Sequence, residues 1–199
     1  EPMFNQTGLR GFLSGIGVEV AAGQLIYADR DRLLFWNNPQ ELINYQPADG
    51  YVGVPDATTR YVWGPMFGRM RADDQGYLWV IRSEYPTAYI SGYDLPLETG
   101  ATPAYTLTSP LPLQGGGVFT WTEYLGLSGI DTQPECDCLW LADEMTHRVF
   151  RVRNASTQPT VDIVLGQLDA SGMDCNQGRG VNWPSQDSLC HPGALAFDQ

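Results

Sequence analysis

The segment LWLADEMTHRVF, at residues 139–150, decides the fold of this chain. Its first part is a short apolar run that ends at Ala142-Asp143, and a polar turn follows. From His147 to Val152 the side chains show the period-2 pattern of a half-buried β-strand. The segment therefore predicts two strands joined by a turn.

The same pattern recurs in units that begin at Gly15, Gly68 and Gly126, and a further copy begins at Gly193. Each unit contains a short first strand followed by a hydrophobic second strand, and the second strands lie near 23–30, 75–82 and 138–143. The predicted third strands are 32–36, 87–93 and 147–152. The predicted fourth strands are 41–44, 104–107 and 162–165.

Four antiparallel strands that repeat every ~40–60 residues are typical of a β-propeller blade, because one small twisted sheet cannot bury both of its faces alone. The 22 Gly and 14 Pro residues imply many turns and disfavour a helix bundle. We therefore predict an all-β fold with one partial β-propeller domain over residues 1–199. Its blades of four antiparallel strands are expected at about 15–67, 68–125 and 126–192, with the start of another at 193–199.

Residues 139–150 resemble the NHL repeat, whose common form is L-[YW]-V-A-D-x-x-N-H-R-V, with Thr146 in place of the usual Asn. The stretches 162–169 and 176–178 are similar to linkers of bacterial, extracellular-type NHL propellers. The second unit diverges, since Val80-Ile81-Arg82 stands where V-A-D is expected. Propellers of this family include enzymes, peptide-binding and RNA-binding modules and extracellular scaffolds, so the resemblance implies a fold and does not select a function.

The resemblance also bears on the size of the protein. Propellers of this family usually have six blades, and three blades cannot close a ring. Residues 5–8 match the linker at 176–178, so the sequence starts inside one linker. We expect the chain to be about half of a six-bladed ring, cut from a longer protein or paired with another copy, because an open blade edge exposes unpaired strand groups.

The charge balance excludes several classes of partner. The formal net charge is -12, and all 11 basic residues are Arg. The chain therefore lacks the basic surface that nucleic-acid binding needs, including the basic face of the RNA-binding NHL branch. Anionic membrane surfaces would repel it, and no apolar run approaches the ~18–20 residues that cross a bilayer.

The cysteine count favours an oxidising compartment. Cys175 and Cys190 bracket a loop-like stretch, and a disulfide between them is expected to stabilise the chain by about 3 kcal/mol. Cys136 and Cys138 could form a tight bridge or remain two thiols. The two His and four Cys could in principle form a zinc site, but the sequence contains no CxxC pair and no CxxCH haem-attachment pattern, so metal ligation by these cysteines is not the preferred interpretation.

Two N-x-S/T sequons, at Asn5 and Asn154, are candidate glycosylation sites. Together with the cysteines, they predict a secreted or cell-surface protein.

Carboxylate, arginine and histidine side chains recur at the turn that follows the second strand. Asp29 and Asp143 occupy matched positions, where they could bind a cation such as Ca²⁺ or accept turn N–H bonds. Their recurrence favours the structural role, with Arg32 and Arg148 as bidentate partners that join turn to strand. His147 could act as a general base, but a packed turn residue is the preferred interpretation because the repeat places no nucleophile beside it.

Glu19 is the odd residue in the apolar strand Val18-Glu19-Val20. Gluconolactonase-like propellers use acidic ligands that point into the central channel, so Glu19 is the best single candidate for a metal ligand. A solvent-facing position on the strand is the preferred interpretation. The sequence contains no nucleophile elbow G-x-S-x-G, no P-loop and no H-E-x-x-H zinc motif.

These observations predict a non-enzymatic, secreted or cell-surface propeller that acts as an interaction or assembly scaffold. Its expected partners are another protein, further copies of itself or the rest of the propeller, and no resident cofactor is predicted beyond a possible Ca²⁺. One alternative is a channel-metal hydrolase or lyase of the lactonase or amidating-lyase kind. A further alternative is a carbohydrate-binding propeller that uses exposed indole rings as stacking platforms. The candidate platforms are Trp36, Trp63, Trp121 and Trp183, of which Trp183 is expected to be the most exposed.

Overall fold

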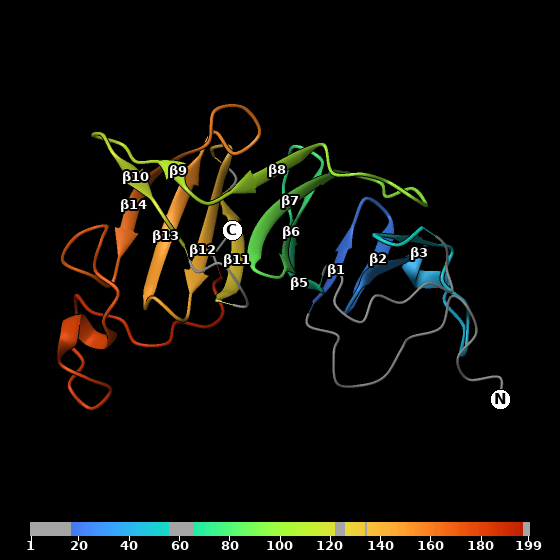
Figure 1. Cartoon of the computed structure of the whole chain (residues 1–199). Helices are drawn as coiled ribbons and strands as arrows, with labels where there is room; N and C mark the ends of the chain where they lie inside the picture. The colour runs from blue at the N-terminus through green and yellow to red at the C-terminus, as the bar shows by residue number, and fades with distance from the viewer. Residues whose placement is uncertain (1–16, 56–65, 122–125, 134, 197–199) are drawn as a thin grey trace. The chain divides into compact units, whose positions relative to one another are not determined.

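A computed structural model of the chain describes residues 17–55, 66–121, 126–133 and 135–196 (Figure 1). Within these ranges the chain consists of strands and turns, with two short 3-10 helices, η2 (Pro39–Glu41) and η3 (Cys175–Gly178). No helix in the described ranges has the length and hydropathy that a membrane crossing requires. The predicted all-β fold is confirmed.

Three four-stranded antiparallel sheets dominate the structure, and in each sheet every strand pairs with its neighbour in sequence. This meander is the topology of a propeller blade, so the predicted blade-type sheets are confirmed. The first sheet contains β1 (Val18–Ala21), β2 (Gln24–Asp29), β3 (Arg32–Asn37) and β4 (Gly50–Val52). The second contains β5 (Met66–Ala72), β6 (Tyr77–Glu84), β7 (Thr87–Asp94) and β8 (Tyr105–Thr108). The third contains β11 (Leu127–Gln133), β12 (Cys138–Asp143), β13 (Arg148–Arg153) and β14 (Thr160–Leu165). A separate hairpin pairs β9 (Leu111–Pro112) with β10 (Val118–Phe119).

The chain divides into two compact units: Glu1–Tyr85 with Ser91–Thr106, and Pro86–Ile90 with Leu107–Gln199. The first sheet belongs to the first unit, and the third sheet and the β9–β10 hairpin belong to the second. The expected start of another blade at 193–199 lies only partly in the described chain, where 193–196 form no strand and 197–199 lie outside.

The first sheet is built on a tight hairpin. Ala22 and Gly23 both have positive φ, at 48° and 75°, which is the geometry of the type I′ turns that match strand twist. Ile26, Ala28 and Leu33 are fully buried and belong to the main apolar cluster of the first unit.

The fourth strand of the first sheet is not at 41–44, so that prediction is wrong. Pro39 begins the 3-10 helix η2 instead, because its ring fixes φ at a helical value. Ile43 is 73% exposed, so a strand there would bury little apolar surface. The fourth strand is Gly50–Val52, where Gly50 pairs with Phe35. A Cβ at residue 50 would overlap the Phe35 ring, which explains the glycine at this position.

The second sheet is organised around Trp79, which is fully buried. Its ring stacks on Tyr105 at a centroid distance of 6.0 Å and meets Tyr77 edge-on at 6.2 Å. Asp73 accepts bonds from the Tyr77 backbone N–H at 2.8 Å and from Trp79 Nε1–H at 2.7 Å. In this second unit, Asp73 in the turn between β5 and β6 therefore binds the indole of Trp79.

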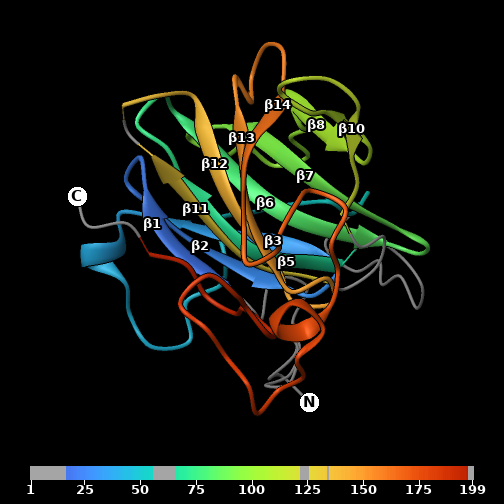
Figure 2. The same cartoon turned by 90° about the vertical axis from the view of Figure 1, so that its left-hand side faces the viewer.

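The third sheet has its strands side by side in chain order, as Figures 1 and 2 show in yellow to orange. Phe150 is fully buried and packs against Phe119 at 4.7 Å and against Trp121 at 6.0 Å between ring centroids. The fourth strands of the second and third sheets, at 105–108 and 160–165, lie close to where the sequence predicts them.

Candidate functional site

The candidate site lies where the turn between β12 and β13 meets the long segment after β14. His147 closes that turn in the left-handed region, with φ 58°. Its carbonyl accepts a bond from Gln167 Nε2–H at 3.1 Å, and its Nδ1 accepts one from the His191 backbone N–H, also at 3.1 Å. Both ends of the segment are thereby attached to one turn of the third sheet.

Residues 166–191 are called here the disulfide loop, because Cys175 and Cys190 are bonded to each other within them. In Figures 1 and 2 the loop lies at the end of the third sheet where β12 passes into β13. Its centre is Asn176, which is 2% exposed. Asn176 Nδ2–H donates to the Gly180 carbonyl at 2.8 Å, and its Oδ1 accepts from Ser188 Oγ–H at 3.1 Å. A covalent bridge and internal hydrogen bonds therefore order a segment that has almost no regular secondary structure.

The ordered loop presents large apolar side chains to solvent. Leu168 is 83% exposed, Trp183 71%, Val181 64% and Met173 46%. We call these four residues the apolar loop set. Burying a side chain of this size is worth about 1.5–3 kcal/mol, so a set of them on an ordered segment favours association with another surface.

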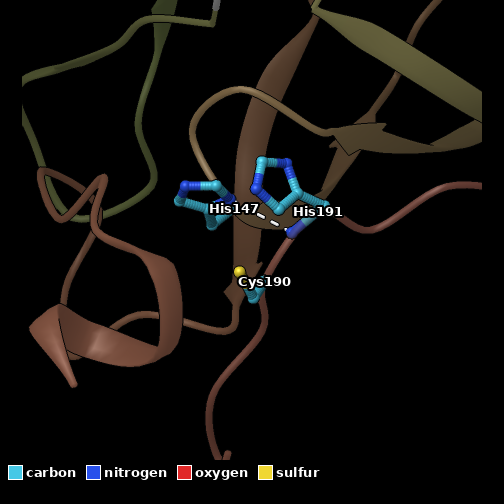
Figure 3. A group of neighbouring side chains, drawn as sticks. All are labelled: His147, Cys190 and His191. Atoms are coloured by element: carbon cyan, nitrogen blue, oxygen red, sulfur yellow. Dashed lines mark hydrogen bonds between the residues drawn. The ribbon is translucent and has the colours of Figure 1, made fainter. Parts of the chain in front are cut away.

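The two histidines form a close pair beside this loop (Figure 3). Their rings meet edge-on at a centroid distance of 4.6 Å, and His191 Nδ1 lies 3.8 Å from Glu144 Oε1. Burial lowers the pKa of His147, and the neighbouring His191 lowers it further. His147 is partly buried in the turn, where the sequence places it, and it also contacts a second titratable group.

The acidic and basic residues of the repeat have structural contacts. Asp29 and Arg32 form a buried salt bridge at 2.9 Å. Asp143 accepts the Thr146 backbone N–H at 3.2 Å. Arg148 donates from Nη1 to the Ala170 carbonyl and from Nη2 to the Thr120 carbonyl, at 2.8 and 2.6 Å.

Arg148 is fully buried, with its guanidinium 4.4 Å above the centre of the Phe119 ring. Burial lowers the pKa of Arg148, and the nearby Asp143 carboxylate acts in the opposite direction. The guanidinium joins the turn, the β10 segment and the start of the disulfide loop.

Glu19 does not face solvent, so the preferred interpretation from the sequence is wrong. Its side chain is 15% exposed and lies 3.9 Å from Arg71 Nη1, whereas Val18 and Val20 are 62% and 60% exposed. The strand is turned so that its charged residue packs towards β5 and its valines point outwards. Arg71 thereby supplies a positive partner at the position proposed for a channel cation.

Cys136 and Cys138, for which the sequence left two possibilities, are bonded to each other. Asn154 is exposed and has a positive φ of 52° in the turn after β13. The hydroxyl of Ser156 in its sequon donates to Asp137 Oδ2 at 2.8 Å. Asn5 lies outside the described residues.

Two of the four indole rings proposed as sugar platforms are inside the protein. Trp36 is 8% exposed and donates to the Gln46 carbonyl, and Trp121 is 3% exposed and donates to the Ala88 carbonyl. Trp183 is exposed, as predicted, and Trp63 lies outside the described residues.

The sequence offers both histidines as possible zinc ligands, but it does not show that His191 lies beside His147. His191 directly follows Cys190, so the disulfide predicted from the sequence fixes its position. That adjacency was the available signal, but nothing in the sequence places His147 beside it.

No protein-family model matches the chain, and no curated protein matches it. Among solved structures, a luciferin-regenerating enzyme is similar with a TM-score of 0.42 and 13% identity, over 79% of this chain and 47% of that one. The major Malassezia sympodialis allergen Mala s 1 is similar with a TM-score of 0.37 and 10% identity, over 80% of this chain and 64% of that one. The chain therefore spans less than two thirds of the length of either structure, and neither similarity identifies its function.

Proposed function

We propose that the chain is a non-catalytic interaction or assembly module whose docking segment is the disulfide loop. The observation that carries the proposal is the apolar loop set, from 46% to 83% exposed. Val181 and Trp183 lie between the bridged Cys175 and Cys190, and the other two residues precede the bridge. A preordered loop loses little conformational entropy on binding, so its apolar contacts contribute more of their burial energy to affinity.

The contacts of the acidic residues support a non-catalytic role. Asp29 is neutralised by Arg32, Asp143 caps a turn, and Glu19 faces Arg71. Each carboxylate that the repeat offers to a channel metal has a structural partner. Among the described residues the lactonase-like alternative has no specific observation in its favour, and the carbohydrate-binding alternative has one exposed indole, Trp183.

Secretion and glycosylation belong to the same proposal. Two disulfides are stable in oxidising compartments, and Asn154 is exposed in a turn where a glycan can attach. The resemblance of residues 139–150 to the NHL repeat supports a further part of the proposal, that this chain forms about half of an NHL-type ring. The rest of the propeller would then be one of its partners.

Site-specific photo-cross-linking tests the docking segment. A benzophenone side chain replaces Trp183 in one variant and Tyr45, which is 97% exposed and lies in the first unit, in a control variant. We expect cross-links from position 183 to one defined protein, either a second copy of the chain or another polypeptide, and none of comparable yield from position 45. Equal, diffuse labelling from both positions would contradict the proposal.

A triple serine variant tests the energetics of the same surface. Replacing Leu168, Val181 and Trp183 with Ser is expected to abolish the cross-link formed through a benzophenone at Met173. The far-ultraviolet circular dichroism spectrum is expected to remain unchanged, because all three side chains are mainly exposed.

A further inference from the structure

A cluster of metal-ligating groups lies where the end of the disulfide loop meets the turn between β12 and β13, and its histidines have no part in the proposed docking. One donor atom from each of His147, Cys190 and His191 lies within 4.8 Å of the others. Figure 3 shows the two imidazole rings side by side, with the Cys190 sulfur below them. The chain has two histidines in all, and the fold brings both to one place although they are 44 residues apart.

We propose that these three residues form a metal site suited to Zn²⁺, which can bind the ion only when the Cys175–Cys190 disulfide is reduced. In the oxidised chain the Cys190 sulfur is bonded to Cys175 and has no thiolate to offer. In the reduced chain it joins two imidazoles in a Cys-His₂ set, which suits Zn²⁺ and leaves a fourth position for water.

The existing hydrogen bonds already orient His147. Its Nδ1 accepts the His191 backbone N–H at 3.1 Å, so the Nδ1 lone pair points at the backbone of the residue that supplies the second imidazole. A metal ion at that lone pair replaces one hydrogen bond. The released N–H belongs to a residue whose side chain is 54% exposed, so water can solvate it at little cost.

Glu144 supplies the outer shell. Its Oε1 lies 3.8 Å from His191 Nδ1, and a small rotation of the exposed His191 ring would bring the Nδ1–H within hydrogen-bond distance and leave the Nε2 lone pair for the metal. A carboxylate behind a ligating histidine fixes its tautomer and raises its basicity, and this is the usual support for zinc-bound imidazole.

The distances need only a small adjustment. Ligands 2.0–2.3 Å from a tetrahedral zinc ion are separated from one another by about 3.3–3.7 Å. The present limit of 4.8 Å exceeds this by just over 1 Å. Rotation of the exposed His191 ring and of the released Cys190 side chain can close that gap without moving the sheet.

The chemistry is balanced by a dithiol or phosphine reductant. Two electrons and two protons enter, the S–S bond breaks, and Cys175 and Cys190 become thiols. A dithiol supplies both protons from its thiols and leaves as its disulfide, whereas with a phosphine a water molecule supplies both protons and the oxygen of the phosphine oxide. Cys190 then loses its proton to solvent as the sulfur–metal bond forms.

The test uses Co²⁺ as a spectroscopic probe and Zn²⁺ as a competitor. The C175S variant leaves Cys190 a permanent thiol without added reductant, and C175S/C190S is its matched control. We expect a sulfur-to-cobalt charge-transfer band with C175S, and its absence from the control and from the oxidised wild type. Zn²⁺ affinity should fall by at least roughly 10–100-fold in the control and in C175S/H191A, because losing a ligand costs no less than losing an outer-shell partner.

Two results would overturn the proposal: a C175S spectrum without the thiolate band, or equal Zn²⁺ affinity in C175S and oxidised wild type. If C175S does not fold, as judged by its near-ultraviolet circular dichroism, the C136S/C138S variant reduced with a phosphine provides the comparison, because Cys175–Cys190 is then the one bridge left to reduce. The C136S/C138S variant, in which the other bridge is removed, controls for general effects of disulfide loss.

Discussion

Replacing Arg32 with Met would remove the cation from the ion pair that ties β2 to β3. Arg32 Nε and Nη2 lie 3.0 and 2.9 Å from Asp29 Oδ2, and the two side chains are 0% and 1% exposed. The variant leaves the Asp29 carboxylate buried without this cation. Breaking a buried pair on one side costs about 3–5 kcal/mol, so we expect a loss of that size in the free energy of unfolding.

The D29L/R32M double variant separates the cost of a stranded charge from the value of the pair. Removing both charges also removes both desolvation penalties, and such replacements are often neutral or stabilising. We therefore expect the double variant to regain most of the stability that R32M loses. Urea unfolding followed by tryptophan fluorescence gives the midpoints and slopes, and an unchanged slope confirms that the unfolding transition is the same.

Arg148 provides the matched contrast. Its guanidinium donates to the carbonyls of Thr120 and Ala170, which a methionine would leave without these bonds. R148M should therefore lose a similar amount of stability, and D143L should not restore it. A loss below about 1 kcal/mol in R32M, or a double variant as unstable as R32M, would refute the reasoning about buried charge.

Three further predictions concern other parts of the chain. Replacing both Cys175 and Cys190 with Ser should lower the free energy of unfolding by about 3 kcal/mol, because the bridge closes a loop with a sequence separation of 15; denaturant titration measures this, and a change near zero would contradict the entropic account. The hydrogen bond with Tyr105 and burial raise the pKa of Tyr77 to about 12. In the unfolded chain this tyrosine ionises near pH 10. The contribution of neutral Tyr77 to the free energy of unfolding is therefore complete below pH 10 and is lost as the pH rises from about 10 to 12. Y77F should lose less stability than the wild type between these pH values in unfolding experiments. Replacing Trp183 with Ser should change the melting temperature little, since the ring is 71% exposed; a large decrease in a thermal scan would show that the ring packs within the protein.

The repeat could be read from the sequence because its strands carry local signals. Alternating side chains and turn residues placed β12, β13 and β14 near their observed positions. The fourth strand of the first sheet was missed because its signal is weak: Gly50–Val52 has three residues and is specified by pairing with β3, not by its own alternation. Pro39 favours the start of the 3-10 helix, and this preference outweighs the apolar pair Leu42-Ile43, from which a strand was predicted.

The candidate site was less visible because its contacts are between distant residues. A turn at His147 and a loop ending at His191 are joined by tertiary structure alone, and neither histidine has the local spacing of a metal motif. The orientation of Glu19 depended on Arg71, which lies on another strand. A one-residue change in strand phase exchanges the two faces, and the short run Val18-Glu19-Val20 could not decide the phase.

The Cα atoms of Cys175 and Cys190 are only 4.5 Å apart, so the part of the disulfide loop between these cysteines begins and ends at almost the same point. A segment with so narrow a base can change in length or composition without altering the distance that the sheet must span. The residues between the two cysteines can therefore be exchanged as a unit while the bridge holds their ends in place. Among related chains, insertions and new side chains should accumulate between these two positions, and grafting a foreign peptide there should leave the blade beneath it folded.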